Sequence, residues 1–120
     1  MANKSIGELE VEINEKKFLL RGTFKALNEI EDKASCDVMT IASDISKGKI
    51  SAKKVIAVLW GGVYGSGERG LTFEDFSEEC VRHGVLSLAG PAAIFLSQSL
   101  VGEKKRAEMT SQSPTTTATV

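Results

Sequence analysis

Residues 7–35, GELEVEINEKKFLLRGTFKALNEIEDKAS, decide the fold of this chain. Glutamates alternate with apolar residues over positions 8–13, which is the period-two pattern of a strand with one exposed and one buried face. The apolar segment FLLR follows at residues 18–21, after four polar residues. The pattern therefore predicts an antiparallel β-hairpin at the start of the domain.

The hydrophobic pattern also suggests a register for this hairpin. If the turn is centred on Glu15 and Lys16, the apolar side chains of both strands share one face and opposite charges meet on the other. The expected cross-strand pairs are then Ile13 with Phe18, Val11 with Leu20, and Glu10 with Arg21. Because a two-stranded ribbon is marginal in water, helices are expected to cover its apolar face.

Four amphipathic helices are predicted after the hairpin. Thr23, Ser51 and Thr72 are suitable N-caps for the first, third and fourth of them. Gly48 and Gly84 are placed to end the second and the fourth. The third helix is apolar on more than one side, which is typical of a central helix. The apolar stripes are Phe24, Leu27, Ile30 and Ala34; Val38, Ile41, Ala42 and Ile45; Val55, Ile56, Leu59 and Val63; and Phe73, Phe76 and Cys80.

Residues 85–101 carry no charge, which is compatible with a membrane span and with a buried last helix. The segment is short for a span and contains serines, a glutamine and a proline, which favours the buried helix. Because Pro91 cannot donate a helix hydrogen bond, we expect a turn over residues 87–90 and a helix that starts near Pro91. The Ser/Thr-rich residues 103–120 are expected to form a disordered tail after a domain of residues 1–102.

A glycine-rich segment, residues 61–70, contains GSGERG, which matches the dinucleotide-binding pattern G-x-G-x-x-G. In dinucleotide-binding proteins this pattern follows a strand and belongs to a βαβ unit, whereas here a helix is predicted before the glycine-rich segment. Gly61 and Gly62 are expected to end the third helix or to let another backbone approach closely. The preferred interpretation is a connection between two helices, and a nucleotide site at Gly65, Gly67 and Gly70 is kept as an alternative.

Composition and residue spacing argue against several other kinds of chemistry. The net charge is −1, and basic residues are not clustered as nucleic-acid binding requires. Cys36, Cys80 and His83 do not have the spacing of a zinc site, and two free thiols fit a cytoplasmic protein. His83 is interpreted as a histidine at a helix end. The expected protein has no catalytic residues, no cofactor and no metal.

Three segments together resemble a known family. Residues 21–31, RGTFKALNEIE, are similar to the helix start that follows the hairpin in gene transfer agent and phage tail assembly chaperones. Residues 48–67, GKISAKKVIAVLWGGVYGSG, resemble the apolar helix and small-residue loop of that family, and residues 71–102 resemble its final helices. The resemblance covers residues 5–102 and implies an α+β domain, mainly α, with an N-terminal hairpin on four to five helices.

The resemblance implies a chaperone that binds the tape-measure protein during tail assembly. A tail-tube protein is a further candidate partner, and self-association is left open. Helix-in-groove binding uses apolar and aromatic anchors. The residues proposed to bind the partner are Trp60, Tyr64, Phe95, Leu96 and Leu100, with core filling as their alternative role. The rival functions are a structural tail component, a nucleotide-binding protein and a small membrane-associated protein; two strands are few for a ring-forming tube subunit.

Overall fold

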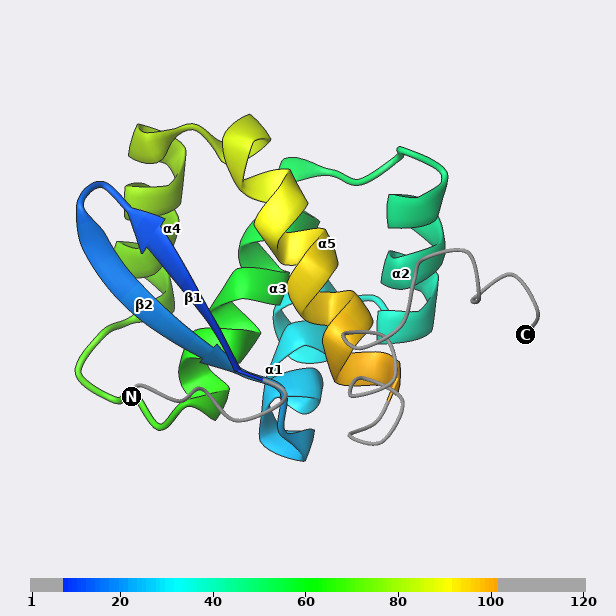
Figure 1. Cartoon of the computed structure of the whole chain (residues 1–120), viewed down its shortest axis with the longest axis horizontal. Helices are drawn as coiled ribbons and strands as arrows, with labels where there is room; N and C mark the ends of the chain where they lie inside the picture. The colour runs from blue at the N-terminus through cyan, green and yellow to red at the C-terminus, as the bar shows by residue number, and fades with distance from the viewer. Residues whose placement is uncertain (1–7, 102–120) are drawn as a thin grey trace, which may run out of the picture.

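The computed structural model describes residues 8–101, which form a hairpin and a bundle of helices (Figure 1). The expected α+β class, mainly α with an N-terminal hairpin, is confirmed. The tail predicted for residues 103–120 and the domain boundary at residue 102 lie outside the described residues. The elements are β1 Glu8–Ile13, β2 Lys16–Arg21, α1 Phe24–Ala34, α2 Val38–Ser46, α3 Ala52–Gly65, α4 Phe73–His83 and α5 Val85–Val101.

The hairpin exists, but its predicted register is wrong by two residues. Asn14 and Glu15 form a two-residue turn with φ of 53° and 69°, so Val11 pairs with Phe18. Both turn residues need the left-handed conformation, which asparagine tolerates better than most residues. Because side chains alternate with period two, a shift of two residues leaves every side chain on its predicted face. The full pairing is Ile13 with Lys16, Val11 with Phe18, Leu9 with Leu20, and Glu8 with Arg21.

Helix α3 is the central element, as its apolar sequence predicts. Every residue from Val55 to Val63 is buried. Helix α1, strand β2, and helices α4 and α5 all pack against α3. A helix surrounded in this way has no solvent-facing stripe, which explains why its sequence is hydrophobic on all sides.

Three glycines of α3 permit this close packing. A β-carbon on Gly61 would lie 2.7 Å from the Ala26 carbonyl oxygen, and one on Gly62 would lie 2.7 Å from the β-carbon of Leu20. A β-carbon on Gly65 would meet the Arg21 carbonyl oxygen. The expectation of a close backbone approach is therefore confirmed. The expected helix end at Gly61–Gly62 is wrong, because α3 continues to Gly65.

The predicted N-caps are confirmed at all three positions. Thr23 accepts a hydrogen bond from the Ala26 N–H, Ser51 from the Lys54 N–H and Thr72 from the Asp75 N–H. Each satisfies a backbone donor that the first helical turn leaves unpaired. One further cap was not predicted from the sequence. Asp37 accepts the Thr40 N–H at 2.7 Å and so caps the start of α2.

Helix α5 is continuous over Val85–Val101, so the predicted turn at residues 87–90 is wrong. Pro91 lies inside the helix and removes one backbone hydrogen bond. The burial of Leu88, Ala92, Phe95 and Leu96 along one side of α5 offsets that loss. Within residues 8–101, no single helix is long and apolar enough to cross a membrane; α4 and α5 meet that test only as a pair bent by 118°.

The apolar stripes predicted for the helices supply most of the core, with exceptions at their ends. Ile30, Phe76 and Cys80 are fully buried, whereas Phe24 is 82% exposed and Leu27 and Phe73 are partly buried. Gly48 and Gly84 follow α2 and α4 with φ of 72° and 108°, which confirms that they end these helices. The core therefore lies between the hairpin, α1, α4 and α5, around α3.

Candidate functional site

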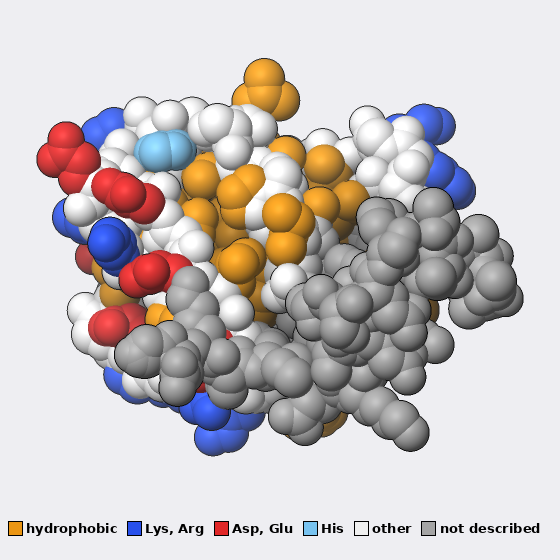
Figure 2. Space-filling model, viewed as in Figure 1, with side chains coloured by type: hydrophobic (Ala, Val, Ile, Leu, Met, Phe, Trp, Pro, Cys, Tyr) orange, Lys and Arg blue, Asp and Glu red, His pale blue; other side chains and the backbone are white. Residues whose placement is uncertain are grey.

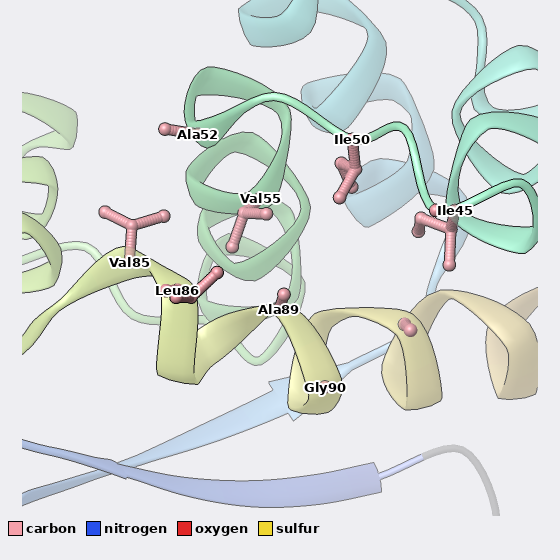
Figure 3. Close-up of a pocket in the computed structure, with 10 residues that line it drawn as sticks. Ile45, Ile50, Ala52, Val55, Val85, Leu86, Ala89 and Gly90 are labelled. Atoms are coloured by element: carbon pink, nitrogen blue, oxygen red, sulfur yellow. The ribbon is translucent and has the colours of Figure 1, made fainter.

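An apolar groove lies between α2, the start of α3 and α5. Its larger part has a volume of about 560 Å³. Figure 3 shows the side chains of Ile45 from α2, Ile50 from the turn and Val55 from α3 directed toward α5. The lining residues carry no charged group; they are Ile45, Gly48, Ile50, Ala52, Val55, Val85, Leu86, Ala89, Gly90 and Ala93.

A second hollow extends this groove along α5 toward its C-terminal end. It has a volume of about 350 Å³ and shares Ile45 and Ala93 with the first. Its other lining residues are Ala42, Ser46, Leu96, Ser97, Leu100 and Val101. Together the two hollows form what we call the α2–α5 groove, and α5 lines it from Val85 to Val101.

The groove is open to solvent, and several of its lining residues are small. Leu86 is 90% exposed at one end, and Ile94 is 51% exposed on α5. Figure 2 shows hydrophobic side chains gathered over α5 in the middle of this face. Gly90 has open space around it, since a β-carbon added there would meet no atom within 4 Å. Exposed apolar surface of this kind marks a site where another chain can pack.

The turn between α2 and α3 borders the groove with positive charge. Lys54 donates a hydrogen bond to Asp44 at 3.1 Å, and this bond raises the pKa of Lys54. That pair ties the end of α2 to the start of α3. Three exposed lysines of the same segment, Lys47, Lys49 and Lys53, form no ion pair with any residue of 8–101. Blue side chains lie over this turn at the upper right of Figure 2.

Four of the five residues predicted to bind a partner fall into two groups. Trp60 and Phe95 are 5% and 0% exposed and belong to the core. Trp60 also donates from Nε1 to the Glu29 carboxylate at 2.9 Å and packs against the rings of Tyr64, Phe73 and Phe76. Leu96 and Leu100 line the α2–α5 groove, although Leu96 itself is 1% exposed. Their role in partner binding remains a prediction.

Tyr64 lies apart from the groove, beside the glycine-rich segment. The Arg69 guanidinium stacks 3.9 Å from the centre of the Tyr64 ring and donates to the Tyr64 carbonyl at 2.8 Å. Gly65 is the last residue of α3, and of the three glycines in GSGERG only Gly67 has a positive φ. The Glu68 carboxylate accepts the Gly70 N–H at 2.8 Å. The Glu68 carboxylate therefore occupies the Gly70 N–H, which a phosphate-binding loop would offer to its ligand. A helix, α3, precedes the glycine-rich segment, as predicted.

Other candidate chemistry finds little support in the described residues. No group of three or more His, Cys, Asp or Glu side chains that could hold a metal lies within residues 8–101. His83 ends α4 and accepts the Asn14 N–H at Nδ1, 3.1 Å away, which fits its interpretation as a histidine at a helix end. The sequence reading missed the groove-lining residues Ile45, Ile50, Leu86 and Gly90 as a group, since they come from three separate segments.

Comparison with known families gives a match over most of the chain. Residues 6–102 match the family described as "Phage tail tube protein, GTA-gp10". The chain belongs to this family. It is therefore a tail-related protein of phages and gene transfer agents, as the sequence resemblance indicated. No curated protein and no solved structure matches the chain.

Membership of the GTA-gp10 family bears on the choice between the two tail functions. The family description names a tail tube protein, so it fits a structural tail component better than an assembly chaperone. The family match supports a tail protein but does not specifically support an assembly chaperone. The family therefore fixes the biological setting of the protein, which is a phage or gene transfer agent tail.

Proposed function

We propose that this protein is a structural component of a phage or gene transfer agent tail that works by binding other tail proteins. The single observation that carries the proposal is the family match over residues 6–102, whose description is a tail tube protein. The protein is proposed to act without catalysis, cofactor or metal. It would be made in the cytoplasm, where tails assemble, and join the tail there.

The experiment that tests this proposal is quantitative mass spectrometry of purified particles. A structural component is expected at a fixed number of copies relative to other tail proteins, and the ratio should persist after a further density-gradient step. Cells that lack the gene should yield particles without complete tails. A chain that is needed for assembly but absent from finished particles would contradict the structural proposal.

A second candidate function, an assembly chaperone for the tape-measure protein, is favoured by the α2–α5 groove. The groove is apolar and open, and an amphipathic helix can lay its apolar face into such a surface. Residues 8–101 also contain only a two-stranded sheet, which offers little material for a ring built from strands. Many weakly bound copies along one long chain would give avidity without tight single contacts.

Co-expression with the tape-measure protein of the same gene cluster distinguishes the chaperone from the structural component. A chaperone should keep the tape-measure protein soluble and co-purify with it. A structural component should be found in particles whether or not it has this effect. A tape-measure protein that stays insoluble and unbound would remove the chaperone candidate and leave the structural one.

A further inference from the structure

We propose that the α2–α5 groove binds an acidic amphipathic helix of a partner protein, with its apolar face in the groove and its carboxylates toward the lysines of the α2–α3 turn. This deepens the proposed function, because it assigns the surface that would contact another tail protein. The inference depends on the proposed tail function only in stating that the partner is a tail protein.

The shape of the groove fits a helix. Helix α5 lines it over 17 residues, which corresponds to roughly 25 Å at the usual rise per residue. The small residues Gly48, Ala52, Ala89, Gly90 and Ala93 let a second helix axis approach closely. The larger side chains at the sides, Ile45, Ile50 and Leu86, can pack between apolar side chains spaced three and four residues apart.

The charge of the α2–α3 turn beside the groove selects the kind of helix. Gly48 and Ala52 line the groove, and both have lysine neighbours in the sequence. Lys47 and Lys49 flank Gly48, and Lys53 follows Ala52. Along its other wall, α5 contributes no charge. A helix whose apolar stripe is bordered by Glu or Asp would therefore gain attraction on one side and meet no like charge on the other. Complementary charge at the rim sets partner choice and orientation.

The binding test uses the purified full chain and two synthetic peptides of about 18 residues, which give helices of roughly 27 Å. Both peptides carry the same leucines at i, i+3, i+4 and i+7. One has glutamates beside the leucine stripe and the other has lysines. Fluorescence anisotropy of the labelled peptides should show binding of the acidic peptide and at least about tenfold weaker binding of the basic one.

Matched variants locate the site. The double variant Lys49→Glu/Lys53→Glu should weaken binding of the acidic peptide by about tenfold, since like charges then face each other. Lys17→Glu/Lys25→Glu changes the net charge equally at exposed positions on β2 and α1 and should leave binding unchanged. Gly90→Leu fills the groove where the structure has open space, so it should abolish binding while the chain stays folded by circular dichroism.

Each contrary outcome overturns a defined part of the proposal. If the two double variants bind the acidic peptide equally well, the proposal that the partner is acidic is wrong. If Gly90→Leu binds the peptide as well as the wild type does, the proposal that the groove is the binding site is wrong. A dimer in sedimentation equilibrium that Gly90→Leu dissociates would assign the groove to a second copy of this chain. Binding to anionic phosphatidylglycerol vesicles but not to the peptide would assign the lysines to a membrane surface. Peptide binding by a chain that is absent from particles would keep this site and reject only the structural tail function.

Discussion

Glu79 is the residue that joins the hairpin to α4. Its side chain accepts hydrogen bonds from Asn14 Nδ2 at 2.8 Å and from Lys16 Nζ at 3.0 Å, and Arg82 lies 3.4 Å away. The Asn14 bond first, and then the Lys16 bond, hold the pKa of Glu79 below its ordinary value of 4.5. The carboxylate therefore adds stability that is present above pH 4.5 and is lost as the pH falls through the lower, folded-state pKa.

Glu79→Gln should remove that part of the acid sensitivity. The free energy of unfolding of the variant is expected to fall less than that of the wild type as the pH is lowered from 6 to 3. Urea titrations at each pH measure the difference. Glu78→Gln, an exposed neighbour on the same helix, is the control and should follow the wild type. Parallel curves for Glu79→Gln and the wild type would show that the hydrogen bonds do not couple to folding.

The two cysteines should differ sharply in reactivity. Cys80 is fully buried, and burial raises the pKa of its thiol to about 12, with the Glu79 charge acting in the same direction. Cys36 is partly exposed. Because the thiolate is the reactive form, a disulfide reagent at pH 8 should titrate one thiol in the native protein and two in denaturant. Cys36→Ser should lose the fast thiol, and a fast second thiol in the wild type would contradict the burial of Cys80.

At the scale of elements, the glycines of α3 and α5 predict opposite effects of the same substitution. Gly61→Ala places a β-carbon against Ile30 and the Ala26 carbonyl oxygen, so α1 and α3 must separate, at a cost of about 1–3 kcal/mol. Gly90→Ala has open space in α5 and should stabilise the protein by about 0.5–1 kcal/mol. Chemical denaturation of both variants measures the difference, and equal effects would contradict the close packing of α1 on α3.

Local signals in the sequence predicted the elements well, because they act over a few residues. Thr23, Ser51 and Thr72 were identified as caps from their own neighbourhoods, and each cap bond is formed within three residues. The hairpin register was missed because it depends on the conformation of Asn14, whose side chain is held by Glu79 far along the chain. A two-residue error leaves the faces unchanged, so the buried side of the hairpin was still predicted correctly.

Features that depend on distant contacts could not be predicted in this way. Pro91 suggested a helix start, but the burial of Phe95 and Leu96 keeps α5 continuous through it. The groove is the clearest example, since Ala42 and Ile45 follow the same spacing as the buried Val38 and Ile41. Periodicity shows that a helix has an apolar face, but not which part of that face a distant segment covers.

At the scale of the whole molecule, the arrangement around α3 predicts a gradient of local stability. Helix α3 packs against α1, β2, α4 and α5, whereas α2 makes few contacts with the rest of the bundle. Local opening should therefore be easiest at α2. Native-state hydrogen exchange is expected to be slowest for amides of residues 55–63 and much faster for those of Val38–Ser46. Equal protection of α2 and α3 would contradict this prediction.

The same arrangement has a consequence for how the chain is made. The hairpin leaves the ribosome before α3 and α4, yet the residues that hold its turn lie about 65 positions later, at Glu79 and His83, and β2 rests on α3. A strand pair alone is marginal in water. The nascent hairpin must therefore wait, with Val11, Ile13 and Leu20 uncovered, until α3 and α4 have been synthesised. A chain stalled before residue 52 would still expose that apolar face. The hairpin can therefore reach its folded state only after most of the domain has been synthesised.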